Sequence, residues 1–235
     1  FLLLLAAFLK GVDEYQELLR CSVAFAGNDH RLGAQEAPPA IISVFLGTDL
    51  EGIIDAIVGD NNYTAPEHKS LRIGVDVLPS IPQDTTDRNR TSPLAFTGNK
   101  FEFRMPGSSQ SIAGPITILN AIMADELDQF YETLKDASDF TAALHKLIRD
   151  TFSAHRRIIF SGNGYEDAWI REAEKRGLAN LRNTAEALPT YLLPKNIEML
   201  TRQGVYSREE ILSRHEVHIE KYCKVIRIEA GTLVD

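Results

Sequence analysis

Residues 100–105 read Lys-Phe-Glu-Phe-Arg-Met, a strict alternation of polar and apolar side chains. Successive side chains on a β-strand point to opposite faces, so the pattern predicts a strand with Lys100, Glu102 and Arg104 on one face. The two phenylalanines on the other face would anchor it on a core. The polar face suits a charged ligand, either a metal held by the carboxylate or anionic groups bound by the cations. A solvated face with cross-strand ion pairs is the alternative.

The sequence changes to helical periodicity from Pro115 onward. Apolar residues recur every three or four positions through residues 116–134, which predicts one helix with an apolar stripe and with Pro115 in its first turn. Asn163-Gly164 marks a turn. Further helices are predicted over residues 140–159, from Tyr165 to Gly177, from Pro194 to Gly204, and from a Ser207-Arg208-Glu209-Glu210 capping box toward the C-terminus.

The first half of the chain is organised differently, because residues 1–115 hold most of its prolines and glycines. Helical spacing of apolar residues predicts a buried helix that continues through Leu19. Residues 40–46 and 71–78 are rich in β-branched side chains and are predicted strands, with a short helix over 49–58 between them. The predicted fold class is therefore α+β: a mixed piece followed by a helical C-terminal region of roughly 100 residues.

Composition limits the class of protein. Hydrophobic residues make up 44% of the chain and the net charge is −8, so the protein is globular, and nucleic acid is not an expected partner. Cys21 and Cys223 lie far apart, which favours a reduced, cytoplasmic setting. The apolar run at residues 1–9 is too short to span a membrane and lacks the flanks of a signal peptide. We interpret it as a buried helix without its upstream partner, which predicts a C-terminal fragment of a larger protein.

Two further polar segments are candidate sites. Residues 27–39 join the first helix to a strand, and in them Arg31 could clamp a carboxylate while Glu36 could act as a base. Residues 84–92 hold Arg90 among hydroxyl side chains, a combination that suits phosphate. An ordinary surface loop is the alternative reading of each segment.

Taken in order, these three segments resemble glutamine synthetase. That family carries an R-L-x-x-x-E-A-P loop, then N-R-[ST]-S, then a basic residue followed by apolar-Glu-apolar-Arg. In this chain, residues 31–38 read RLGAQEAP, residues 89–92 read NRTS and residues 100–104 read KFEFR. The surrounding sequence, including HRRIIFSGNGYEDAWIREAEKRGL at residues 155–178, resembles the large type III branch. The resemblance covers essentially the whole chain.

The resemblance implies an enzyme that ligates ammonia to glutamate, with ATP as co-substrate and Mg²⁺ or Mn²⁺ as cofactor, through γ-glutamyl phosphate. It implies that residues 1–135 are the later part of a catalytic domain built of antiparallel strands and helices. Residues 136–235 would be an all-helical C-terminal region. It also implies a cytoplasmic homo-oligomer, a ring and by analogy with type III enzymes a dodecamer, that contacts neither membrane nor nucleic acid.

Substrate-handling roles carry over residue by residue from the resemblance. Arg31 and Arg104 match the arginines that hold the substrate glutamate. Glu36 matches the flap glutamate that closes the site and helps to deprotonate ammonium. Arg90 matches the arginine that faces the transferred phosphoryl group. The candidate catalytic residues are therefore Glu36, Arg31 and Arg90.

Nucleotide and metal roles carry over in the same way. Lys100 stands where the family has a basic residue near ATP, Arg90 contributes to the nucleotide site, and Glu102 matches a carboxylate on the metal nearest the nucleotide. Phosphoryl transfer needs positioned cations and metal at the γ-phosphate, which agrees with the charged face of residues 100–104.

The sequence also departs from the family pattern. Ala95 stands where the short-form enzymes have a second arginine, and residues 47–86 resemble a branch-specific insertion. The family's other metal ligands would lie upstream, so this chain is predicted to be inactive by itself. Two alternatives remain open: a γ-glutamyl ligase that acts on an amine, and a non-catalytic regulatory or assembly relative.

Overall fold

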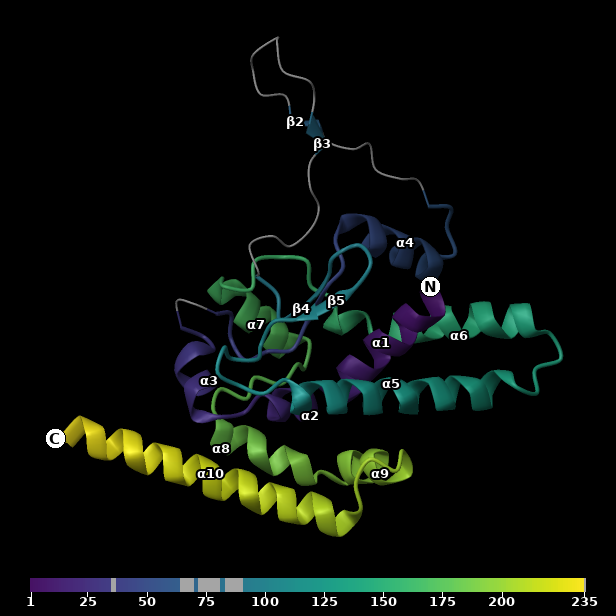
Figure 1. Cartoon of the computed structure of the whole chain (residues 1–235). Coiled ribbons are helices and arrows are strands. Elements are labelled where there is room, and N and C mark those ends of the chain that lie inside the picture. The colour runs from purple at the N-terminus through teal and green to yellow at the C-terminus, as the bar shows by residue number, and fades with distance from the viewer. Residues whose placement is uncertain (35–36, 64–69, 72–80, 83–90, 235) are drawn as a thin grey trace.

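The computed structural model describes residues 1–34, 37–63, 70–71, 81–82 and 91–234. Helices dominate it, and a small sheet lies among them (Figure 1). The helices are α1 (Leu2–Glu14), α2 (Gln16–Ser22), α3 (Ala26–Arg31), α4 (Thr48–Gly59), α5 (Ala113–Leu134), α6 (Phe140–Ala154), α7 (Asp167–Lys175), α8 (Thr184–Ala187), α9 (Pro194–Arg202) and α10 (Arg208–Val234), with 3₁₀ turns η1 (Arg156–Ile158) and η2 (Leu188–Leu192).

The main sheet has the order β1–β4–β5, with strands β1 (Val44–Phe45), β4 (Leu94–Phe96) and β5 (Phe101–Phe103). Strand β5 confirms the strand expected from the alternating residues 100–105. It pairs antiparallel with β4, whereas β1 pairs parallel with β4. The expectation of antiparallel strands is therefore wrong for β1, because α4 lies in the connection from β1 to β4 and a parallel pair needs such a crossover.

The two predicted β-branched strands have different outcomes. Within residues 40–46 only β1 forms a ladder, because Ile41 bridges Asn180 of the C-terminal region instead of continuing along β4. Of residues 71–78, only Leu71 lies within the described residues; it belongs to β2 (Ser70–Leu71), which pairs antiparallel with β3 (Ile81–Pro82).

Two helix predictions and one loop prediction need correction. The helix predicted through Leu19 is two helices, because the backbone of Tyr15 (φ −114°, ψ 25°) breaks the α-helical conformation between α1 and α2. The helix predicted over residues 140–159 ends at Ala154, where the chain tightens into η1. The loop expected at residues 27–39 begins as helix α3, whose polar residues give no apolar periodicity to detect.

The other helix predictions are confirmed, including α4, α5, α7 and α9, each within a few residues of its expected ends. The capping box at the start of α10 is reciprocal: the Glu210 backbone N–H donates to the Ser207 hydroxyl (3.2 Å) and the Ser207 N–H donates to the Glu210 carboxylate (2.8 Å). Gly177 and Gly204 follow α7 and α9 with φ of +71° and +64°, the left-handed conformation that ends many helices.

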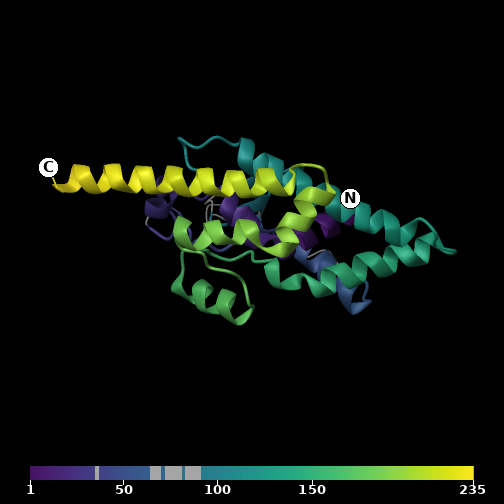
Figure 2. The ribbon, with the colours of Figure 1, turned by 90° about the horizontal axis from the view of Figure 1, so that it is seen from below.

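One hydrophobic core joins the beginning of the chain to its end. Helix α1 packs against α5 and α6, and α2 packs against α5 and η2. Helix α10 runs along η2, and its C-terminal end projects past the other helices (Figure 2). Among the described residues, no helix combines the length and the apolar character that crossing a membrane requires. The division into residues 1–135 and 136–235 stays a prediction.

Gly11 gives the packing of α1 on α5 a testable consequence. A Cβ atom at Gly11 would lie 2.3 Å from Cγ2 of Ile122, which is buried. Overpacking of this kind costs about 1–3 kcal/mol, more than the ~1 kcal/mol that alanine gains over glycine in a helix. We expect Gly11→Ala to lower the free energy of urea unfolding. Gly231→Ala is the control, because no atom lies within 4 Å of its added Cβ; equal effects of the two changes would contradict the packing argument.

Candidate active site

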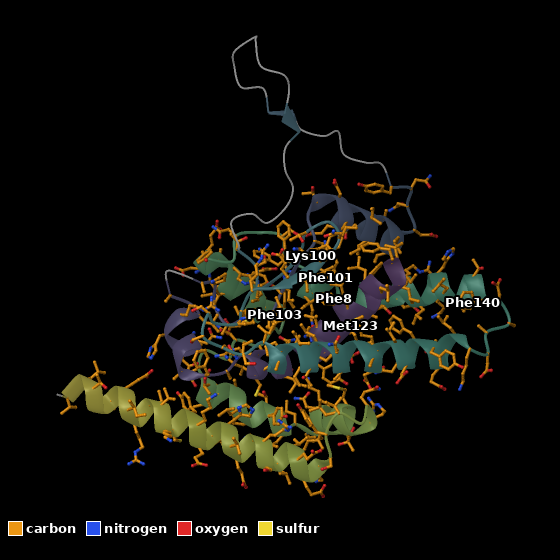
Figure 3. All side chains as sticks on the ribbon, in the orientation of Figure 1. Phe8, Lys100, Phe101, Phe103, Met123 and Phe140 are labelled. Carbon is orange, nitrogen blue, oxygen red and sulfur yellow. The ribbon has the colours of Figure 1, made fainter. Side chains whose placement is uncertain are left out.

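Strand β5 and its two flanking residues present the charged face that the sequence predicts. The Glu102 carboxylate receives Arg104 on one oxygen, with N–O distances of 3.0 and 3.2 Å, and Lys100 lies 3.3 Å from the other. On the opposite side Phe101 stacks on Phe8 of α1 at 3.8 Å between ring centroids (Figure 3). The alternation therefore separates a charged face from a core face, as expected.

The three charged side chains differ in their surroundings. The Arg104 side chain is 16% exposed, Glu102 is 37% exposed and Lys100 is 65% exposed. Hydrogen bonds from Arg104 and then from Lys100 lower the pKa of Glu102, so the carboxylate is ionised at neutral pH. Arg104 is also fixed through its backbone, since its N–H donates to the Pro93 carbonyl at 2.7 Å. Arg104 is therefore built into the fold, whereas Lys100 extends toward solvent.

Arg31 is held beside the end of this strand by a residue that the sequence did not single out. Its Nε donates to Oδ1 of Asn28 (3.0 Å), and its guanidinium also donates to the Met105 carbonyl. Asn28 is fully buried, and its amide donates to the carbonyls of Val23 (2.8 Å) and Met105 (3.0 Å). Asn28 thus ties α3 to the residue that follows Arg104.

A cavity of about 390 Å³ brings together most of the predicted residues whose side chains the structure describes. Arg31, Glu102 and Arg104 all line it. Lys100 contacts Glu102 but is not a lining residue. The remaining walls are Leu32, Ala37, Pro38, Pro39, Ser92, Pro93, Met105 and Tyr165.

Two predicted residues, Glu36 and Arg90, lie outside the described residues. Their neighbours in sequence do line the cavity: Ala37 follows Glu36 directly, and Ser92 is two positions after Arg90. All three sequence segments singled out above therefore reach one cavity, either with a candidate residue or with its close neighbours.

Tyr165 is a wall of this cavity that the sequence analysis did not identify. It comes from the turn before α7, far along the chain from Met105, the last of the other lining residues. Asn163-Gly164 predicted that turn correctly. The pattern gave no sign that the turn faces the charged strand, because only the tertiary fold brings them together.

Whether the described residues could bind a metal ion depends first on Glu102. An ionised carboxylate at a cavity wall suits a hard divalent cation. Within the described parts of the chain, however, no group of three or more His, Cys, Asp or Glu side chains is placed to hold a metal ion. The described residues therefore do not by themselves form a site with three such ligands, and Glu102 is the carboxylate among the described lining residues of the cavity.

Comparison with known proteins gives consistent matches. The glutamine synthetase C-terminal domain family matches residues 143–235. A type-3 glutamine synthetase from Dictyostelium discoideum is 46% identical over 239 residues, which cover 100% of this chain and 32% of the relative. Glutamine synthetases from Butyrivibrio fibrisolvens and Bacteroides fragilis (strain YCH46) are 42% and 41% identical over 99% and 100% of this chain, and 33% of each relative is covered.

The chain spans about a third of the length of these relatives. Its resemblance to the family extends over its whole length, well beyond the residues that match the C-terminal domain. The chain is therefore similar over its whole length to glutamine synthetases, a type-3 enzyme among them, and its residues 143–235 match the C-terminal domain of that family.

Proposed function

We propose that this chain forms part of an ATP-dependent glutamate–ammonia ligase that makes glutamine through γ-glutamyl phosphate. One observation carries the proposal: Arg31 from one sequence segment, and Glu102 and Arg104 from another, line a single cavity. Two guanidinium groups and an ionised carboxylate in one cavity suit a zwitterionic dicarboxylate such as glutamate. Arginine binds carboxylates with paired hydrogen bonds, and the carboxylate attracts cations.

In this proposal Arg31 and Arg104 hold the carboxylates of glutamate. Each has a fixed anchor, which reduces the entropy lost when substrate binds: Arg31 on Asn28 and the Met105 carbonyl, Arg104 on Glu102. Glu36 would take a proton from ammonium, because a carboxylate both attracts the cation and accepts its proton.

The nucleotide side is assigned to Arg90, Lys100 and Glu102. Arg90 would face the transferred phosphoryl group, and the exposed ammonium of Lys100 would reach the nucleotide. Glu102 would be one ligand of Mg²⁺ or Mn²⁺, which neutralises phosphate charge when bound. We propose that the other metal ligands lie in a part of the full-length protein that corresponds to the region of the relatives not covered by this chain. The 235-residue chain alone would then be inactive.

Assembly and location follow from the same proposal. The functional enzyme would be a cytoplasmic homo-oligomeric ring, and a dodecamer is the form that we propose. Residues 1–135 would complete the catalytic domain, and residues 136–235 would form its helical C-terminal region.

The direct test is phosphate release from Mg-ATP and glutamate by the full-length protein that carries this chain. We expect release to require ammonium and to fall at least about tenfold in Glu36→Ala, since a positioned general base contributes this much or more. The isolated 235-residue chain should release none. Release that requires an added amine instead would favour the amine ligase, and no release from an assembled full-length protein would favour the non-catalytic relative.

A further inference from the structure

The turn at Gly162–Tyr165 contacts two loops beside the cavity, which we call the Pro38 loop (residues 37–39) and the Thr91 loop (residues 91–93). The Thr91 hydroxyl donates to the Gly162 carbonyl (3.4 Å). A Cβ atom at Gly164 would lie 2.1 Å from the Thr91 carbonyl oxygen and 3.4 Å from Cβ of Pro38. Gly164 does not have a positive φ, so its backbone conformation does not require glycine. Only the space between the turn and the two loops requires it.

The turn is itself fixed on the sheet. The Phe160 N–H donates to the carbonyl of Val44 in β1 (2.9 Å), and the Ser161 hydroxyl accepts from the Gly47 N–H (3.2 Å). On the far side of the turn, the buried Trp169 of α7 stacks on Phe160 with ring centroids 3.7 Å apart. Hydrogen bonds to β1 and to the loop that follows it therefore fix the turn, and the turn in its fixed place limits where the Pro38 and Thr91 loops can lie.

The last residue of the turn enters the cavity itself. Tyr165 lines the same cavity as Arg31 and Arg104, and 41% of its surface is exposed. Its backbone N–H is held by Oδ1 of Asn163 at 3.1 Å, which fixes where the side chain leaves the turn. A phenol ring in a cavity with two guanidinium groups supplies an apolar wall and a hydroxyl group to a bound dicarboxylate.

We infer that the Gly162–Tyr165 turn makes the C-terminal domain part of the substrate site. Gly164 is a positioning residue that sets the Pro38 and Thr91 loops, which lead to Glu36 and Arg90. Tyr165 is a wall of the glutamate cavity that contributes to substrate affinity. This inference rests on the proposed function, and it assigns to residues 143–235 a role in substrate binding in addition to packing.

The two residues predict different kinetic signatures in the full-length protein. Tyr165→Ala removes a wall that contacts substrate before and during reaction, so the KM for glutamate should rise about tenfold with kcat and the KM for ATP little changed. Tyr165→Phe keeps the ring and should restore most of the affinity. Gly164→Ala pushes the Thr91 loop away, and a displacement near 1 Å should lower kcat by on the order of 10²-fold.

The controls separate this inference from the proposed function. Gly231→Ala makes the same chemical change in open space and should leave both parameters unchanged. The thermal midpoint of each Tyr165 variant is measured beside that of the wild type, so a kinetic change at an unchanged midpoint reports the site. An active wild type with unchanged Tyr165→Ala and Gly164→Ala variants overturns the inference alone. A wild type without ammonium-dependent phosphate release overturns the proposed function and the inference with it.

Discussion

Replacing Arg104 with glutamine is expected to lower kcat/KM for glutamate by about 10²- to 10³-fold in the full-length protein. The side chain is 16% exposed and donates two hydrogen bonds to Glu102. In the proposed complex the Arg104 guanidinium pairs with a substrate carboxylate, and removing one partner of such a pair at a binding site costs about 2–5 kcal/mol, where each 1.36 kcal/mol is about a factor of ten. Two losses combine: the substrate loses a guanidinium, and the pKa of Glu102 rises because its strongest hydrogen-bond donor is gone.

Initial rates against glutamate at saturating Mg-ATP and ammonium measure this effect. Lys146→Gln is the matched control, because Lys146 is an exposed cation on α6 that pairs with Asp150 and is not among the lining residues of the cavity. Circular dichroism of each variant checks that the helices are intact. An Arg104→Gln variant that matches the control would show that the cavity does not bind glutamate through this side chain.

The charged strand was predictable because its information is local. A period of two in residues 100–105 separates polar from apolar side chains whatever the rest of the fold does, and β5 shows that separation. The capping box at Ser207 and the glycines after α7 and α9 are local signals too, and they placed helix ends correctly.

The residues that were missed act through contacts distant in sequence. Asn28 bonds to Met105 across 77 positions, and in sequence it is only one more polar residue in a polar segment. Tyr165 lines the cavity although it follows α6 in the sequence. The neighbouring Asn163-Gly164 predicts a turn but does not indicate a binding site. The break at Tyr15 escaped detection for a related reason: apolar spacing continues through it, since α1 and α2 bury their apolar faces in the same core.

Replacing Asn28 is expected to reduce both the stability of the fold and the substrate affinity of the candidate site. Leucine has nearly the same shape but makes no hydrogen bonds, so Asn28→Leu leaves the Val23 carbonyl and the Arg31 Nε without this partner. Each buried polar group left unpaired costs about 1–3 kcal/mol. We therefore expect the free energy of unfolding of this chain to fall by about 2–5 kcal/mol, measured by urea denaturation. Asn61→Leu, at an exposed position, should change it by less than about 0.5 kcal/mol.

The same substitution should also weaken glutamate binding in the full-length protein, because Asn28 fixes one edge of the Arg31 guanidinium. Arg31 would keep its bond to the Met105 carbonyl and lose the one that sets its orientation. A carboxylate binds best to a guanidinium fixed in plane, so the KM for glutamate should rise in protein that is still folded. A folded Asn28→Leu variant with reduced stability and an unchanged KM would limit Asn28 to a structural role. A raised KM would instead show that the α3 junction orients the substrate arginine, which places one determinant of glutamate binding behind the cavity wall, in a residue that substrate never touches.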